Sequence, residues 1–496
     1  MTKTVYDHLA AMIEAHADRV AICFEEETLT YRAFADAIEV AARHLRAFGI
    51  GKGSTFALYA QNRVEHMIAY YAAARLGAVF VPLNPNLTAS EVEYAFRHSG
   101  ATILFHDDFA GNVARAAVPV TSLRSLDELR APTDGLAACK DAVVAPEDDF
   151  LIIYTSGSTG APKAIVLDHA AQVKAAKALA EMWGLTPEDV TLVGLPLGYL
   201  YGLSTGAAVG LQAGGRVVIL RRFHPRDVLE ALVSHRVTIY HGVPTMFSMM
   251  LEYCEQRDLT YDLSGVRALI CAGAPLAEEM RERFAQRFGK TIQDYYAATE
   301  ATPVFGTYAD DPTPIPKGAV GRAAPELKVR IVRPDGTDCG DDEDGEVLVR
   351  AAATMKRYFN NPEQTDAALY DGLFRTGDLG RRDREGYFYI TGRIKDIIIR
   401  GGANISPSEV EAVISSHPAV QDIAVVGAPD RIFGEVPIAF VVLRHGASVT
   451  QEELVAHAEK TLSDFKVPRT ILFESELPLG LTGKFDKKVL KARFQA

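Results

Sequence analysis

The chain has 496 residues, a 48% hydrophobic and 23% charged composition, and a formal net charge of -12. This length exceeds what one ordinary hydrophobic core needs, and the composition is typical of a folded soluble protein. The acidic balance argues against a nucleic-acid surface, which needs clustered lysine and arginine to displace counterions. Five scattered cysteines without a C-x-x-C pair predict neither a disulfide framework nor a zinc site.

The first twenty residues form an amphipathic pattern that includes acidic side chains and lacks the continuous apolar segment of an export signal. The longest apolar run, residues 67–83, is broken by Arg75 and Gly77 and is shorter than the roughly 20 residues of a spanning helix. We therefore expect a cytoplasmic protein without a transmembrane segment. Residues 67–83 are predicted to be a buried helix that leads into a strand.

Helical patterns alternate with short apolar runs from residue 30 to about 240. The helical patterns cover 31–49 and 227–236, and the apolar runs cover 54–60, 78–83, 102–106, 216–220 and 237–242. This alternation is typical of β-α-β units around a parallel sheet. Residues 265–390 are richer in strand-like sequence, with Asp-Gly turns between the strands.

A domain boundary is predicted near residues 393–404, where a charged strand, a Gly-Gly pair and a helix start follow one another. Ser406 is the expected N-cap of that helix, Pro407 suits its first position, and Glu409 is expected to complete a capping box. The fold class is therefore α/β. We expect a large N-terminal domain of parallel sheets covered by helices with a β-rich subdomain (1–394), and a small mobile α+β domain (395–496).

The segment YTSGSTGAPK, residues 154–163, follows an apolar strand. Its glycines allow backbone N–H groups to approach a ligand, its hydroxyl groups add donors, and Lys163 adds a positive charge. These features suit a polyphosphate, although the G-x-x-x-x-G-K spacing of a mononucleotide P-loop is absent. A flexible Ser/Gly linker is the alternative.

The same segment resembles the phosphate-binding signature of the adenylate-forming superfamily, which includes acyl-CoA synthetases, luciferases and adenylation domains of peptide synthetases. Further motifs of that superfamily follow in the expected order, so the resemblance covers essentially the whole chain. They are YYAATE (295–300), YFNNPEQT (358–365), LFRTGDLGRRDREGYFYITGRIKD (373–396) and LPLGLTGKFDKKVL (477–490).

The resemblance implies an ATP-binding site. The phosphate loop would hold the β- and γ-phosphates with Thr155, Ser156, Gly157, Ser158, Thr159, Gly160 and Lys163. Thr299 would contact the α-phosphate, and Glu300 would bind Mg²⁺, a hard cation that prefers carboxylate oxygens. The adenine would lie against Gly273, Ala274, Pro275 and the ring of Tyr296. Asp378 would accept hydrogen bonds from the ribose, with Arg393 near the ribose and phosphates.

Lys484 is implied to be the catalytic lysine that bridges the carboxylate of the acid and the α-phosphate of ATP. Lys395 matches the hinge about which the small domain turns. Gly401 and Gly402 would then line the path of the CoA pantetheine arm, where missing side chains leave room.

The acid pocket is expected to contain Tyr199, His241, Ala297 and Ala298. Ala297 replaces a usual glycine and would shorten or bend the pocket, while Ala164 and Arg357 depart from the family pattern elsewhere. The pocket is expected to be mainly apolar, which favours a medium-length fatty or aryl monocarboxylate. Arg267 and His241 are weak candidates for pairing with a dicarboxylate.

The implied activity is an ATP-dependent acid–CoA ligase with Mg²⁺ as cofactor. Its partners would be the acid, ATP and CoA, and the sequence is also compatible with a homodimer. One alternative is an acyl-AMP ligase that delivers to a carrier protein. A distant alternative is a serine hydrolase, because GLSTG (202–206) matches the G-x-S-x-G pattern around Ser204.

Overall fold

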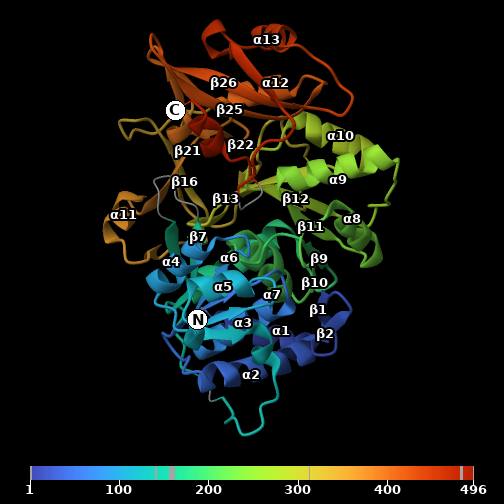
Figure 1. The fold of residues 1–496 in the computed structure, drawn as a ribbon, viewed down its shortest axis with the longest axis vertical. Helices are drawn as coiled ribbons and strands as arrows, with labels where there is room; N and C mark the ends of the chain where they lie inside the picture. The colour runs from blue at the N-terminus through green and yellow to red at the C-terminus, as the bar shows by residue number, and fades with distance from the viewer. Residues whose placement is uncertain (1–2, 140–141, 156–161, 312, 481–483, 495–496) are drawn as a thin grey trace.

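The computed structural model describes residues 3–139, 142–155, 162–311, 313–480 and 484–494. Three sheets build the body of the molecule, and a fourth sheet forms the core of a small domain near the C-terminus (Figure 1). Helices cover the large sheets, so the predicted α/β class with a large and a small domain is confirmed.

The ten-stranded sheet has the order β15-β14-β13-β12-β11-β9-β10-β1-β2, with β18 beside β14. Its central strands pair in parallel from β13 through β1, as the alternating sequence predicts. Its strands are β1 (Val20–Phe24), β2 (Glu27–Thr30), β9 (Val190–Val193), β10 (Arg216–Ile219), β11 (Ile239–Gly242), β12 (Ala268–Ala272), β13 (Ile292–Ala298), β14 (Ala301–Gly306), β15 (Arg322–Ala323) and β18 (Ala353–Thr354).

The seven-stranded sheet has the order β19-β8-β7-β4-β3-β5-β6. Strands β7, β4, β3, β5 and β6 are parallel, whereas β8 and β19 are antiparallel additions at one edge. The strands are β3 (Thr55–Tyr59), β4 (Val79–Leu83), β5 (Leu104–His106), β6 (Leu123–Ser125), β7 (Asp149–Thr155), β8 (Lys163–Asp168) and β19 (Arg357–Tyr358).

The third sheet is the predicted β-rich subdomain, and all of its strand pairs are antiparallel. It contains β16 (Lys328–Val332), β17 (Gly345–Arg350), β20 (Leu369–Tyr370), β21 (Leu373–Arg382) and β22 (Phe388–Arg393).

Helices of the large domain lie around and between these sheets (Figure 1). They are α1 (Val5–His16), α2 (Tyr31–Ala47), α3 (Val64–Leu76), α4 (Ala89–Ser99), α5 (Gly111–Ala117), α6 (His169–Met182), α7 (Val209–Gln212), α8 (Pro225–Ser234), α9 (Pro244–Arg257), α10 (Glu278–Phe288) and α11 (Pro362–Ala367), with the short 3₁₀ helices η1 (Val120–Ser122) and η2 (Leu126–Arg130) and the π-helix η3 (Tyr201–Ala208).

Helix α3 is buried on all sides, because it contacts β4 of one large sheet and β1 of the other. Twelve of its thirteen residues are buried. A helix in that position needs mostly apolar residues around its whole circumference, which explains why apolar residues dominate its sequence. The predicted buried helix that leads into a strand is confirmed as α3 and β4.

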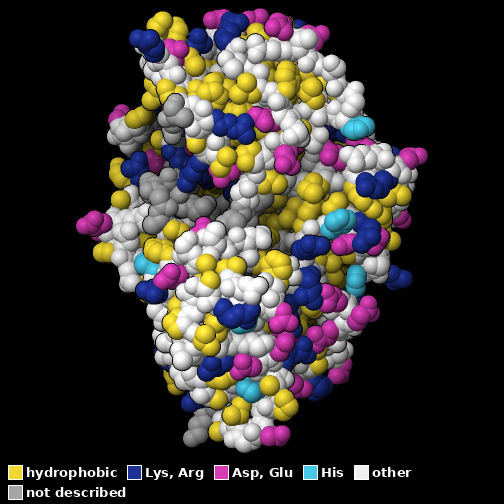
Figure 2. Space-filling view, viewed as in Figure 1, with side chains coloured by type: hydrophobic (Ala, Val, Ile, Leu, Met, Phe, Trp, Pro, Cys, Tyr) yellow, Lys and Arg dark blue, Asp and Glu magenta, His cyan; other side chains and the backbone are white. Residues whose placement is uncertain are grey.

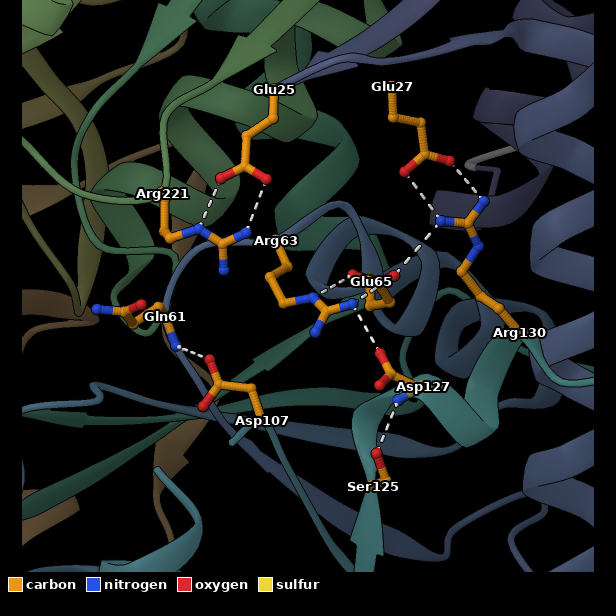
Figure 3. A network of polar contacts seen from close by, with 10 residues as sticks. All are labelled: Glu25, Glu27, Gln61, Arg63, Glu65, Asp107, Ser125, Asp127, Arg130 and Arg221. Atoms are coloured by element: carbon orange, nitrogen blue, oxygen red, sulfur yellow. Dashed lines mark hydrogen bonds and ion pairs between the residues drawn. The ribbon is translucent and has the colours of Figure 1, made fainter. Parts of the chain in front are cut away.

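An ionic network closes one end of α3 (Figure 3). Glu65, whose side chain is 3% exposed, accepts hydrogen bonds from Arg63 at 2.9 Å and from Arg130 of η2 at 3.4 Å. Arg130 also binds Glu27 of β2, and Arg63 also binds Asp127 of η2. The network therefore joins the edge of the ten-stranded sheet to the helix between the sheets.

The small domain surrounds a sheet of β23 (Ile398–Arg400), β24 (Ala403–Ile405), β25 (Val420–Asp430), β26 (Gly434–Leu443) and β27 (Thr470–Glu474). Its helices are α12 (Pro407–Ser415), α13 (Gln451–Glu459) and α14 (Lys487–Ala492), with η5 (Asp464–Lys466). A turn, η4 (Ile394–Asp396), connects β22 to this domain and contains the position predicted as the hinge.

The predicted capping box at α12 is wrong. Ser406 is the N-cap, but its hydroxyl donates to the carbonyl of Thr391 at 2.6 Å instead of capping its own helix. The Glu409 carboxylate accepts hydrogen bonds from Lys466 at 2.7 Å, so it does not reach back to the N-cap. Contacts with distant segments have replaced the local hydrogen bonds that the sequence pattern favours.

No helix in the described ranges is long and apolar enough to span a membrane. All five cysteines are free.

Candidate active site

The two ends of the phosphate loop face each other across a strand pair. Thr155 ends β7 and Lys163 begins β8, and the two residues are register partners. The loop between them is therefore held at both ends by a sheet, which a flexible linker would not require. Five of the predicted phosphate ligands, Ser156, Gly157, Ser158, Thr159 and Gly160, lie outside the described residues.

Asp378 is the centre of a buried polar group on β21. It is 4% exposed and accepts hydrogen bonds from the Tyr296 hydroxyl at 2.5 Å and from Arg393 Nε at 2.7 Å. Arg393 is its register partner on β22, and the Asp378 backbone N–H is held by the Thr376 hydroxyl at 3.0 Å. Three residues predicted to bind the nucleoside thus lie in direct contact.

Aromatic rings support Tyr296 from behind. Its ring stacks on Phe305 with centroids 5.7 Å apart, and Phe305 stacks on Phe388 at 4.1 Å. Burial and the neighbouring Asp378 raise the pKa of Tyr296, so its hydroxyl stays protonated and donates to Asp378. The ring has a fixed orientation, as stacking on a flat heterocycle such as adenine requires.

Lys484 reaches this group from the small domain. Gly273, which follows β12 with a φ of +93°, lies so close that an added Cβ would sit 3.2 Å from Lys484 Cε. Burial, with a contribution from nearby Arg393 and against an opposing one from Asp378, lowers the pKa of Lys484 to about 8. The predicted catalytic lysine and the predicted adenine segment, which begins at Gly273 and continues through Ala274 and Pro275, are therefore adjacent.

A second group lies at the start of β8. The Tyr358 hydroxyl donates to Glu300 Oε1 at 2.8 Å and accepts a hydrogen bond from Lys163 Nζ at 3.3 Å. Glu300 lies in the turn between β13 and β14, next to Thr299. The structure thus brings the predicted phosphate lysine and the predicted metal ligand to one tyrosine that sequence reasoning did not assign.

Glu300 fits a magnesium ion that is shared with a phosphate ligand. Among the residues that the structure places, no three His, Cys, Asp or Glu side chains form a ready cation site. Mg²⁺ typically takes one or two carboxylates and completes its shell with phosphate oxygens and water. A single carboxylate near the phosphate loop is consistent with that mode of binding.

The predicted hinge and CoA residues lie on the small domain. Burial and nearby Arg393 lower the pKa of Lys395, which lies within η4. Gly401 and Gly402 form the turn between β23 and β24 with φ values of +57° and +87°, and both are exposed. Their positive φ values favour glycine whether or not a ligand passes them.

Two of the predicted acid-pocket residues, His241 and Ala297, lie in one aromatic and apolar region. His241 on β11 is 2% exposed and lies among aromatic rings, with centroids 5.0 Å from Trp183 and 5.7 Å from Tyr201. Ala297 packs against the same apolar cluster. Tyr199 lies near Glu91 of α4, and burial raises its pKa. Tyr201, two residues further along, lies beside His241.

His241 and Arg267 are poorly suited to an anionic group. Burial lowers the pKa of His241 to about 3, so the imidazole is neutral near pH 7. Arg267 donates to both carboxylate oxygens of Asp189 at 2.8 Å and to the carbonyl of Trp183, so its charge is already paired. Neither candidate for binding a second carboxylate is free to do so.

A hollow separates the small domain from the large domain on the face shown in Figure 2, and basic side chains gather beside it. Residues from both domains lie near one another, because Arg393 and Asp378 of the large domain affect the pKa of Lys484 in the small domain. A site of this kind is completed only when the small domain is in place.

The model of the AMP-binding enzyme family matches residues 9–359, and that of the AMP-binding enzyme C-terminal domain matches residues 409–484. The chain belongs to the AMP-binding enzyme family. Feruloyl-CoA synthase from Amycolatopsis sp is 34% identical and covers 94% of both chains. Long-chain-fatty-acid--CoA ligase FadD13 from Mycobacterium tuberculosis is 34% identical over 91% of this chain and 90% of its own length. The predicted resemblance to adenylate-forming enzymes is confirmed.

Solved structures agree with this assignment. ATP-bound MatB from Rhodopseudomonas palustris matches with a TM-score of 0.90 at 29% identity, covering 100% of this chain and 99% of that chain. The apo form of MatB matches with a TM-score of 0.79. The overall arrangement of this AMP-binding enzyme is therefore closer to that of ATP-bound MatB.

The geometry gives no support to the serine hydrolase alternative. Ser204 lies in the buried η3 segment and donates its hydroxyl hydrogen to Gln172 Oε1 at 2.5 Å. An amide oxygen cannot act as the general base that a nucleophilic serine needs. The G-x-S-x-G match is explained by close packing, because a Cβ on Gly202 would clash with the Pro196 carbonyl.

Proposed function

We propose that the protein is an ATP-dependent acid–CoA ligase that works through an acyl-AMP intermediate. The observation that carries the proposal is the position of Lys484 beside Gly273, next to the Tyr296–Asp378–Arg393 group. A cation supplied by a separate domain at a nucleoside-type pocket is suited to neutralising two anions as they meet. The CoA ligase relatives support the thioester product.

In the first step, a carboxylate oxygen of the acid forms a bond to the α-phosphorus of ATP, and the bond between that phosphorus and the bridging oxygen breaks. Pyrophosphate leaves with the electron pair. Such a step depends on positioning and charge neutralisation more than on proton transfer. Lys484 would hold the two reacting anions together, Thr299 would contact the α-phosphate, and Lys163 would hold the leaving group.

Asp378, Arg393 and Tyr296 would position the nucleoside. In the structure, Asp378 uses one oxygen for Tyr296 and the other for Arg393. Each carboxylate oxygen can accept a further hydrogen bond, so the ribose hydroxyls can bind without breaking either contact. Thr155 and the residues up to Gly160 would surround the β- and γ-phosphates.

In the second step, the thiol of CoA loses its proton to solvent and its sulfur forms a bond to the acyl carbon. The bond between that carbon and the phosphate oxygen breaks, and AMP leaves with the electron pair. We propose that the small domain (395–496) turns about Lys395 between the steps. This movement would take Lys484 out of the site and bring Gly401 and Gly402 toward the pantetheine arm. Their exposure in the present arrangement is consistent with a role in another one.

We propose a monocarboxylate with an aryl or medium-length alkyl group as the acid. The support is the aromatic and neutral surroundings of His241, the paired state of Arg267, and the presence of Ala297 and Ala298 in apolar clusters. Tyr201 and Trp183 add aromatic rings beside His241. The substrates ATP and CoA and the free cysteines suit a cytoplasmic enzyme.

Pyrophosphate release across a panel of aryl, alkyl and dicarboxylic acids tests the first step, and the mass of the product formed with CoA tests the second. Lys484→Ala should abolish acyl-AMP formation while largely sparing CoA transfer from supplied acyl-AMP. Equal loss of both half-reactions would contradict the two-arrangement mechanism. Release of pyrophosphate without acyl-CoA would instead favour delivery to a carrier protein.

A further inference from the structure

Tyr358 lies between the two charged groups of the phosphate side. Its hydroxyl donates to Glu300 Oε1 at 2.8 Å and accepts from Lys163 Nζ at 3.3 Å. The Lys163 ammonium also lies over the tyrosine ring, 4.9 Å from its centroid. One neutral side chain therefore contacts a cation on one side and an anion on the other.

The backbone around Tyr358 is fixed to the strand that carries Lys163. β19 pairs with β8, and Phe359 N–H donates to the Ala164 carbonyl at 2.8 Å. The neighbouring Arg357 adds a two-pronged ion pair with Asp149 of β7 at 3.1 and 2.5 Å. Arg357, which departs from the family pattern, thus anchors the strand that carries Tyr358.

Without the hydroxyl, Lys163 and Glu300 would attract each other. A flexible lysine and a carboxylate this near would form a direct ion pair, because no other described cation contacts Glu300. That pair would occupy the charges that a polyphosphate and a metal ion need. Burial and nearby Glu300 raise the pKa of Tyr358, so the phenol keeps the proton that it donates to Glu300.

We propose that Tyr358 is a positioning residue that separates Lys163 from Glu300, so that the lysine stays available to phosphate oxygens and the carboxylate to a cation. The proposal rests on the proposed function, which gives those roles to Lys163 and Glu300. It goes beyond that function by assigning a task to a residue that need not contact any substrate.

The test measures binding of ATP without metal, in EDTA, by isothermal titration calorimetry. Four proteins are compared: wild type, Tyr358→Phe, Glu300→Gln and the double variant. Tyr358→Phe should weaken metal-free ATP binding about fivefold, as expected when a partly shielded ion pair competes for Lys163. In the Glu300→Gln background the same change should have less than about a twofold effect, because no carboxylate is left to capture the lysine.

An equal loss of affinity in both backgrounds would show that the tyrosine only packs, and no loss in either would show that it does not separate the charges. Either result overturns the proposal. Thermal unfolding of all four proteins identifies a variant that fails to fold. If wild type binds no ATP even when Mg²⁺ is present, the proposed function fails and this proposal falls with it. Normal wild-type binding isolates the role of Tyr358.

Discussion

Arg444 of the small domain forms an ion pair with Glu279 of α10 in the large domain, with 2.5 Å between Nη2 and Oε1. Both side chains are mostly buried, at 20% and 23% exposed. Arg444 is also held by the Pro418 carbonyl at 2.9 Å, so it is oriented by its own domain before it reaches across. The pair is a specific contact that must break if the small domain turns.

We expect Arg444→Ala to slow acyl-AMP formation about two- to fivefold, because the lost pair stabilises the arrangement in which Lys484 is in place. CoA transfer from supplied acyl-AMP should be unchanged or faster. Arg469→Ala is the matched control, since Arg469 pairs with Glu459 and Asp464 within the small domain. A similar loss in both half-reactions, or in the control, would contradict a role in domain arrangement.

The protonation of Lys484 predicts a pH dependence for the first half-reaction. Its pKa is lowered by burial to about 8, and the proposed role requires the ammonium form. The kcat/KM for pyrophosphate release without CoA should therefore be flat below about pH 8 and fall about tenfold per unit above it. Bound ATP and acid are anions that favour the ammonium, so the break in kcat should lie at higher pH.

Lys484→Arg provides the control for that profile. Arginine keeps its charge over the whole range, so any remaining activity should lose the break. If the pH profile of the Lys484→Arg variant still breaks at the same pH, the break must come from the titration of another group.

The alternation of helices and strands could be predicted from the sequence because it follows from local patterns. The apolar segment 67–83 is an example, because a helix with apolar side chains on every face must be buried on every face. The α12 capping box failed for the opposite reason. Ser406 and Glu409 carry the right local pattern, but Thr391 and Lys466 offer partners that only the folded chain supplies.

The same distinction applies to the candidate site. Asp378, Arg393 and Lys484 stand within recognisable motifs, and the structure brings them to one place. The role of Tyr358 was not predicted because its partners are distant in the sequence: Lys163 is 195 residues away and Glu300 is 58 residues away. A tyrosine without a nearby motif partner is usually interpreted as a core residue. The available signal was its place at the start of the YFNNPEQT motif, directly after the unusual Arg357.

Asp378→Asn should raise the KM for ATP at least about tenfold, because an amide makes weaker hydrogen bonds to ribose hydroxyls and leaves Arg393 without its anion. Steady-state kinetics with ATP varied at saturating acid measures the effect. Asp383→Asn is a close control on the same hairpin, since Asp383 also accepts a tyrosine hydroxyl, from Tyr389 at 3.0 Å. An equal change in the control would show a general loss of hairpin structure.

The network around Glu65 predicts an effect on stability rather than on catalysis. Glu65→Gln keeps the size of the side chain but removes a charge that is 3% exposed and bound by Arg63 and Arg130. We expect the free energy of unfolding to fall by about 2 kcal/mol, less than for a fully buried pair because the two arginines keep Asp127 and Glu27 as partners.

Urea unfolding followed by circular dichroism at low and high salt measures this change. Glu188→Gln is the control, because Glu188 pairs with Arg19 at the surface with a side chain 74% exposed. Glu188→Gln should change the urea unfolding midpoint only slightly, and 1 M salt should abolish that small change. The Glu65 effect should largely persist in salt, because the Glu65 carboxylate is buried and is screened much less than a surface charge. A Glu65→Gln midpoint equal to that of wild type would show that the network adds no net stability.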